Sequence, residues 1–199
     1  MTRPGIDDIE AARAVYQPLT QSVRTLIDTL VRTEVDLDSA RAAHAHIQKA
    51  LDLLGETVMP GSFGTCSELQ QRGEPWGNVV IGLRNPLALP LDIVDDSPGQ
   101  VSADMHVGAA YEGPPGHVHG GVCSLLLDHV LSAAAYQPGR PVYTGTLQIT
   151  FVRPTPLGDL RCEAWVEHEA GRKTYVRGRL VSDGHTTVKA QGIFIRPVD

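Results

Sequence analysis

The chain has 199 residues, 42% of them hydrophobic and 20% charged, which is the composition of a globular protein and not of a disordered one. Its 23 acidic residues outnumber 17 basic ones, giving a formal net charge of -6, and this balance argues against nucleic acid or an anionic membrane as partner. No apolar stretch approaches the ~20 residues of a membrane-spanning helix, and the first residues lack the apolar core of a signal peptide. Three widely spaced cysteines without a CxxC pair predict a reducing, cytoplasmic location.

Residues 6–54 are expected to form two helices. In the first helix, apolar residues recur every three or four positions, at Leu19, Val23, Leu26 and Leu30, which is the spacing of one helix face. Pro18 is expected to break or kink this helix near its start. The second helix is expected to begin at a cap on Asp38 or Ser39, to carry an apolar stripe through Ile47, Leu51 and Leu54, and to end at Gly55.

Residues 55–78 are rich in glycine and proline and show little periodicity, which is typical of a linker. We therefore place a boundary after this segment. Residues 1–78 are predicted to be a helical extension with its linker, and residues 79–199 a core domain.

The core domain shows the two-residue alternation of half-buried strands. The segment 101–109 is the first clear example, and Asp183-Gly184 separates two of the later strands as a hairpin turn. Between early and late strands lies an apolar run, 122–136, which predicts a nearly buried helix ended by Pro138 and Gly139. This order predicts an α+β fold in which an antiparallel sheet wraps around one central helix. The later strands are expected near 146–151, 160–167, 173–182 and 186–196.

The most informative segment is a Gly/Pro-rich loop, 111–119, that leads directly into the buried helix. Gly120 and Gly121 stand at the helix start, where backbone N–H groups lack intrahelical partners and suit a developing oxyanion. Asp128 lies in the otherwise apolar helix, where a carboxylate is expected to have a partner or a chemical role. The rise from Gly121 to Asp128 is about 10 Å, so the two groups can act together through water and a carbonyl group, or across two copies of the chain.

Plainer interpretations of these residues remain open. The glycines also fit an ordinary helix start, and Asp128 also fits a carboxylate bonded to a neighbour or facing a wet edge. Cys123 in the first helical turn is a candidate nucleophile, although a small buried cysteine is the more common situation. His117 and His119 lack a third metal ligand at a recognised spacing, so no metal site is expected.

Two long motifs resemble the hotdog-fold thioesterases of the phenylacetate-pathway (PaaI-like) type. The chain reads EGPPG at 112–116, VHGG at 118–121 and then Asp128 after six residues, which is similar to the EGPPG-x-VHGG-x6-D motif of animal acyl-CoA thioesterases. The resemblance continues through TGTLQITFVRP at 144–154 and GRK at 171–173. It covers about residues 79–196 and leaves the N-terminal helices outside.

This resemblance implies roles for residues at matching positions. Asp128 falls where the family has its general base or nucleophile, and Gly121 where a backbone N–H polarises the thioester carbonyl, with Gly120 allowing close approach. His119 falls at the histidine that orients the thioester, and Thr144 at the residue that positions the water or the acid. In the family such sites form across a dimer.

The resemblance also implies substrate contacts, and it shows one departure. Many PaaI-like enzymes have an asparagine six residues before the motif histidine, where this chain has Gly113. A second donor to the carbonyl group is therefore either missing or replaced, and His117 is the candidate replacement. Thr146 lies on the polar side of the strand that carries Thr144. The phosphates of coenzyme A are expected to bind to charged side chains at strand ends and turns, namely Arg153, Arg172 and Lys173.

The resulting expectation is an acyl-CoA thioesterase that cleaves a fatty or aryl acyl-CoA, without metal or redox cofactor, coenzyme A entering as part of the substrate. A homodimer or a dimer of dimers is expected, with the active site at the subunit interface. A non-hydrolytic acyl-CoA-binding or regulatory protein, and an enoyl-CoA hydratase/dehydratase of the same fold, are the alternatives. The N-terminal helices fit either a lid over the acyl group or an assembly element.

Overall fold

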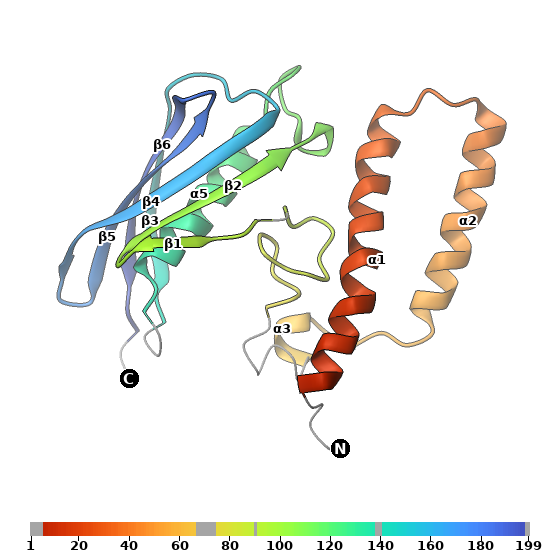
Figure 1. The fold of residues 1–199 in the computed structure, drawn as a ribbon, viewed down its shortest axis with the longest axis horizontal. Coiled ribbons are helices and arrows are strands. Elements are labelled where there is room, and N and C mark those ends of the chain that lie inside the picture. The colour runs from red at the N-terminus through yellow and green to blue at the C-terminus, as the bar shows by residue number, and fades with distance from the viewer. Residues whose placement is uncertain (1–5, 67–74, 90, 138–140, 198–199) are drawn as a thin grey trace. The chain divides into compact units, whose positions relative to one another are not determined.

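The computed structural model describes residues 6–66, 75–89, 91–137 and 141–197. The chain divides into two compact units, Met1–Leu87 and Ala88–Asp199, which are coloured from red to yellow and from green to blue in Figure 1. The boundary predicted from composition, at 78/79, stays a prediction. None of the described helices combines the length and the apolar character needed to cross a membrane.

The first unit consists of helices and turns. Helix α1 (Ile6–Arg32) and helix α2 (Leu37–Gly55) run in opposite directions on either side of the connection 33–36 (Figure 1), and a short helix α3 (Phe63–Cys66) follows. The turns at 75–87 are bound to α1 by arginines. Arg24 of α1 donates to the carbonyl oxygens of Gly82 and Asn85 at 3.2 and 3.0 Å. The Arg84 guanidinium lies 3.7 Å from the centre of the Tyr16 ring, a cation–π contact.

Two details of these helices differ from the sequence-based expectation. The α1 helix continues through Pro18, so the prediction that this proline breaks the helix was wrong. The cap of α2 is Asp36, whose side chain accepts a hydrogen bond from the Ser39 N–H at 2.8 Å. We expected Asp38 or Ser39, but the residue that starts a helix accepts from the amide two or three positions ahead, and Asp36 meets this condition.

The second unit is a six-stranded antiparallel sheet with the strand order β1-β2-β4-β5-β6-β3. The short strand β1 and strand β3 form its two edges. A 3-10 turn (Ala109–Tyr111) and the loop 112–119 follow β2 and lead into helix α5. The element bounds are β1 Val94–Ser97, β2 Gln100–Val107, α5 Gly120–Ala135, β3 Tyr143–Phe151, β4 Gly158–Ala170, β5 Lys173–Ser182 and β6 His185–Ile195.

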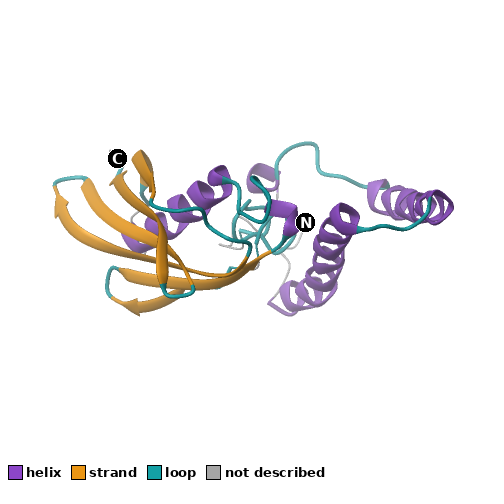
Figure 2. Cartoon of the chain, turned by 90° about the horizontal axis from the view of Figure 1, so that it is seen from above, coloured by secondary structure: helices purple, strands orange, loops and turns teal. Residues whose placement is uncertain are grey.

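Helix α5 packs against one face of the curved sheet (Figure 1 and Figure 2) and supplies the centre of the core. Its residues Leu126, Leu127, Val130 and Leu131 are completely buried. A Cβ atom at Gly178 would lie 2.5 Å from Leu131 Cδ1, so the missing side chain on β5 is what lets the helix approach the sheet this closely. Burying several large aliphatic side chains at about 1.5–3 kcal/mol each is the main driving force for this packing.

The α+β prediction is confirmed by this arrangement. The four later strands and the buried helix lie where the alternation placed them, and Asp183 and Gly184 both have positive φ, 48° and 74°, as a two-residue I′ hairpin turn requires. Strand β1 was not separately predicted, because all four of its residues are exposed and no alternation marks them. The predicted end of the helix at Pro138 and Gly139 lies outside the described residues; α5 ends at Ala135.

Candidate active site

The loop before α5 is held in a compact hairpin by its own backbone. Glu112 and Val118 form an isolated antiparallel bridge, and the Gly113 N–H donates to the His117 carbonyl oxygen at 2.9 Å. The Glu112 carboxylate accepts from the Gly116 N–H at 2.6 Å, and Gly116 has the positive φ of 74° that a residue with a side chain rarely adopts. The EGPPG motif therefore sets the shape of the loop that delivers His119 to the helix start.

His119 is the N-cap of α5 and accepts, through Nδ1, a hydrogen bond from the Gly121 N–H at 3.0 Å. A ring nitrogen that accepts carries no proton, so the imidazole is neutral and its proton is on Nε2. His119 is exposed, and Nε2 is the ring nitrogen that the cap does not use. The structure thus brings together His119 and Gly121, which the sequence marked as site residues. Their contact uses the Gly121 N–H as the hydrogen-bond donor of the helix cap.

The other backbone N–H group at the start of α5 belongs to Gly120. Within the described residues its N–H group donates no hydrogen bond. A Cβ atom built on Gly120 would lie 3.1 Å from Cζ of Phe151, so this ring, at the end of β3, borders the helix start. Phe151 was not selected from the sequence, since the alternation marks it only as a strand residue.

Asp128 lies two turns further along α5, half-buried, and Thr144 at the start of β3 donates a hydrogen bond from Oγ1 to Asp128 Oδ1 at 3.0 Å. The pair joins the two motifs that the sequence marked separately. A hydroxyl that donates to one carboxylate oxygen fixes the carboxylate and leaves the other oxygen for a water molecule. The roles of these two residues in a reaction stay a prediction.

Two further titratable groups of α5 lie in the core of the unit. Burial lowers the pKa of His129 from its ordinary 6.5, and the neighbouring Asp128 carboxylate opposes this shift. Burial raises the pKa of the Cys123 thiol, although Cys123 lies in the first turn, where a thiolate is favoured electrostatically. A buried thiol that resists ionisation is a poor nucleophile, so the geometry supports a packing role for Cys123.

The expected substrate-binding side chains lie at different places on the sheet. Thr146 is exposed on β3. A register shift separates it from Thr144, because Thr144 pairs with Phe194 and Thr146 with Ile193, so the two threonines point to opposite faces and the expected shared polar side is not formed. Arg153 follows the far end of β3, whereas Arg172 and Lys173 lie at the opposite end, because Lys173 and Tyr143 are both in register with Ile195. Nine residues of strand separate the two ends, about 27–30 Å. One chain therefore does not bring Arg153 together with the other two cations.

His117 and Gly113 belong to the loop hairpin. The Nδ1 atom of His117 lies 2.8 Å from the Pro115 carbonyl oxygen, so it is a donor and the ring's Nε2 is left as an acceptor in the neutral form. A Cβ atom at Gly113 would lie 2.8 Å from Cα of His119. A larger residue at 113 would have to displace the cap, which explains why this loop has a glycine there.

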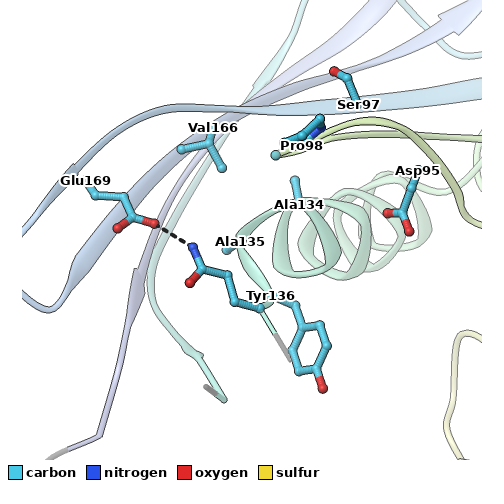
Figure 3. A pocket seen from close by; sticks show the side chains of 10 residues that line it. Asp95, Ser97, Pro98, Ala134, Ala135, Tyr136, Val166 and Glu169 are labelled. Atoms are coloured by element: carbon cyan, nitrogen blue, oxygen red, sulfur yellow. Dashed lines mark hydrogen bonds between the residues drawn. The ribbon is translucent and has the colours of Figure 1, made fainter. Parts of the chain in front are cut away.

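A cavity of about 700 Å3 lies at the C-terminal end of α5 and does not include Asp128. Figure 3 shows a hydrogen bond from Gln137 Nε2 to Glu169 Oε1, 3.1 Å long, among the side chains that line the cavity. Apolar side chains such as Ala134 and Val166 share this lining with Asp95. In the part of the chain that the structure describes, no group of three or more His, Cys, Asp or Glu side chains is placed to hold a metal ion.

Comparison with known proteins gives these motifs a context. The thioesterase superfamily matches residues 115–189, which contain the helix start, Asp128 and Thr144. Acyl-coenzyme A thioesterase THEM5 of Mus musculus is 34% identical over 92 residues, which are 45% of this chain and 37% of the mouse protein. The match thus spans well under half the length of that relative.

Solved structures extend the similarity to most of the chain. The PaaI protein of the E. coli phenylacetic acid degradation operon, 24% identical, covers 55% of this chain and 81% of its own with a TM-score of 0.52, a likeness of fold. A thioesterase superfamily protein of known crystal structure is 30% identical, with 91% of this chain and 95% of that chain covered and a TM-score of 0.73. The chain therefore belongs to the thioesterase superfamily and has its hotdog fold, in the PaaI-like form that the EGPPG and HGG motifs indicated.

Proposed function

We propose that the protein is an acyl-CoA thioesterase that hydrolyses a fatty or aryl acyl-CoA to the free acid and coenzyme A. The observation that carries this proposal is the hydrogen bond from Thr144 Oγ1 to the half-buried Asp128 carboxylate. It fixes a potential base on the helix whose first amide, the Gly120 N–H, is available to a carbonyl oxygen, while the Gly121 N–H is bound by His119. Membership of the thioesterase superfamily and the mouse acyl-coenzyme A thioesterase relative support the reaction class.

In the proposed reaction Asp128 removes a proton from a water molecule as the water oxygen attacks the thioester carbonyl carbon. The carbonyl oxygen becomes an oxyanion, stabilised by the Gly120 N–H, and by the Gly121 N–H when the His119 ring turns away from it. The carbon–sulfur bond then breaks as the carbonyl re-forms, and the proton held by Asp128 passes to the leaving thiolate. The products are a carboxylic acid and the free thiol of coenzyme A, and no redox step is involved.

We propose further that two copies of the chain share each site. Along β3, the Thr144 end contacts Asp128 and the Phe151 end borders Gly120. Antiparallel pairing of two β3 edges about a two-fold axis carries the Phe151 end of one strand toward the Thr144 end of the other. The partner's Gly120 then approaches Asp128, which the ~12 Å rise along one helix prevents within a single chain.

The unpaired edge of β3 supports such a dimer. This strand is nine residues long, and Tyr143 and Phe151 are 65% and 56% exposed. A long, flat, apolar edge is a liability unless another strand covers it. The same pairing would bring Arg153 of one copy toward Arg172 and Lys173 of the other, as phosphate contacts for coenzyme A. The free, buried thiols Cys123 and Cys162 support a reducing, cytoplasmic compartment.

A thiol-release assay over a panel of acyl-CoA substrates tests the proposal. Asp128→Asn keeps the size and the Thr144 contact but cannot accept the proton, so we expect it to lose at least ~99% of turnover. Asp92→Asn is the matched control, because Asp92 is exposed and outside the site. Hydrolysis retained by the Asp128 variant would refute the base. Ligand binding without thiol release by the unmodified protein would favour the binding-protein alternative, and turnover of an enoyl-CoA without thiol release the hydratase.

A further inference from the structure

Helix α2 has no contact that explains why it is a helix. It is 19 residues long and none of its residues is buried. Its apolar side chains Leu37, Leu51 and Leu54 are 74%, 55% and 51% exposed. An isolated helix of about 15–20 residues is marginal in water, and helices in proteins owe most of their stability to a packed apolar face. Leu54, at the C-terminal end of α2, lines a cavity together with Leu19 and Val23 of α1. Along the rest of its length the apolar face of α2 has no packed partner among the described residues.

That face is a narrow stripe of heptad type. Leu37, His44 and Leu51 repeat every seven residues, and Ala40, Ile47 and Leu54 do the same three positions later. This is the seam spacing of two helices that pack along their lengths. The charged residues Asp38, Lys49 and Asp52 fall on the opposite face. The stripe is suited to one more helix and not to a flat surface.

We propose that the occupant is α2 of a second copy of this chain, packed antiparallel about a two-fold axis between residues 45 and 46. The stripe is complementary to itself in this register, because each small or polar seam residue meets a large apolar one. The three layers, each present twice, are Leu37 with the partner's Leu54, Ala40 with the partner's Leu51, and His44 with the partner's Ile47.

The flanks of the seam fit the same pairing. On one side Arg41 would lie nearest the partner's Gln48, a neutral amide whose oxygen accepts from a guanidinium. On the other side Ala43 and Ala50 face the partner's alanines, so the two helices can approach closely. Like charges do not meet in this register, since the two Arg41 side chains are ~13 Å apart along the axis. A contact in which the same patch serves both partners is the standard isologous interface.

The neighbouring helix supplies the remaining area. One pair of 19-residue helices buries less than the ~1,200–2,000 Å2 of a stable interface. Helix α1 of the same unit also exposes an apolar stripe, with Val15, Leu26 and Leu30 at 63%, 39% and 66%, and α1 and α2 do not pack against each other along their lengths. Two such hairpins (residues 6–55) joined through α2 would cover both stripes in a four-helix arrangement.

The helical unit is shared with a relative, which fits a second copy better than an incidental ligand. The 91% of the chain covered by the superfamily structure exceeds what Ala88–Asp199 alone spans, so it includes part of the helical unit. A homomeric contact needs nothing but the chain itself, and the self-complementary stripe provides it. This inference does not depend on the proposed catalytic activity.

Disulfide trapping on the full-length chain tests the register. In a Cys66→Ser background, protein carrying Leu37→Cys is mixed with protein carrying Leu54→Cys, oxidised, and run on a non-reducing gel. We expect a cross-linked dimer from the mixture. Leu37→Cys alone should give none, because the two copies of position 37 lie about 26 Å apart in the antiparallel pair. Cross-linking by Leu37→Cys alone would show parallel pairing and overturn the proposal, as would absence of any cross-link.

Matched substitutions on the two faces of α2 test its energetics. Leu51→Asp places a charge in the seam and should reduce the cross-linked yield at least ~10-fold. Leu53→Asp makes the same change on the opposite face, where Leu53 is 71% exposed, and should leave the yield unchanged. His44→Leu replaces the polar seam residue and should trap the dimer at lower protein concentration. Equal effects of the two aspartates, or weaker trapping with His44→Leu, would contradict the pairing.

Discussion

At the start of α5 the two glycine amides differ in their hydrogen bonding. The Gly121 N–H is held by the His119 ring at 3.0 Å, whereas the Gly120 N–H donates no hydrogen bond within the described residues. Sequence resemblance pointed to Gly121 as the donor. The geometry makes Gly120 the amide that is open without any rearrangement, so the two can be tested separately.

Gly120→Pro removes that N–H and little else. Position 120 is the first helical residue, where proline fits, and His119 already has φ -59° and ψ 133°, a conformation allowed before proline. We expect kcat for thioester hydrolysis to fall ~100–1,000-fold, the usual cost of one oxyanion donor. Gly120→Ala places a Cβ at the same distance from Phe151, 3.1 Å, but keeps the N–H. Similar activity of the two variants would show that this amide has no role.

Thr144 is expected to act through Asp128 and not on the substrate. Thr144→Val removes the 3.0 Å hydrogen bond to the carboxylate. A hydrogen bond to a charged group is worth ~1.5–3 kcal/mol, so kcat should fall about 10–100-fold while KM changes little. Thr144→Ser retains the hydroxyl and should restore most of the rate. A normal kcat for the valine variant would show that the hydrogen bond from Thr144 is not needed to position Asp128.

At the scale of elements, α5 forms the centre of the core and carries the residues of the proposed site, and its His129 is a titratable ring that the packing partly buries. Burial lowers the pKa of this histidine from 6.5. As the pH falls below 6.5, His129 therefore takes up a proton in the unfolded chain first, and in the folded chain only at a lower pH. The free energy of unfolding must fall as the pH is lowered through this window.

The contribution of His129 can be isolated by difference. Urea unfolding between about pH 7.5 and about pH 5.5 should show a smaller loss of stability for His129→Asn than for the unmodified protein, by at most ~1.4 kcal/mol per pH unit for one proton. His185→Asn is the matched control substitution, because His185 is an exposed histidine at the start of β6. An identical pH profile for the His129 variant would mean that this ring is not the proton acceptor.

The elements themselves were largely predictable from sequence, for a physical reason. Strands such as β5 alternate buried and exposed residues, and α5 is apolar over most of its length, so the pattern of apolar residues along the chain predicts which side chains are buried. Pro18 was misjudged because the α1 helix tolerates it once the rest of the helix is formed. The contact of Thr144 with Asp128 was expected only from resemblance, since two residues 16 positions apart meet through packing and not through local periodicity.

Other parts of the site depend on tertiary approach and were not predictable. The ring of Phe151 beside Gly120 arises from the sheet order, which places β3 at the edge next to β6. The His119 cap was missed for a different reason. Histidine is an uncommon N-cap, and its tautomer becomes evident only when its partner, Gly121, is known.

At the scale of the whole molecule, the proposed sharing of sites makes a quantitative prediction about mixtures. Asp128→Asn and Gly120→Pro each destroy one half of a site. If the halves come from different copies, subunit exchange between the two inactive variants creates heterodimers with one intact site each. Roughly a quarter of normal activity should return, because half of randomly formed dimers are heterodimers. Absence of any recovered thiol release after confirmed exchange would place both halves in one chain.

Phe151 belongs both to the uncovered edge of β3 and to the border of the first α5 amide. If the edge pairs as proposed, diluting the protein below the dissociation constant of the dimer must abolish the turnover of each molecule and not merely separate two working enzymes. A substitution at this edge that weakens dimer formation would then also disturb the proposed binding site for the thioester carbonyl group. Selection for activity would therefore act on the dimer interface as well. Specific activity would report on self-association in the same measurement.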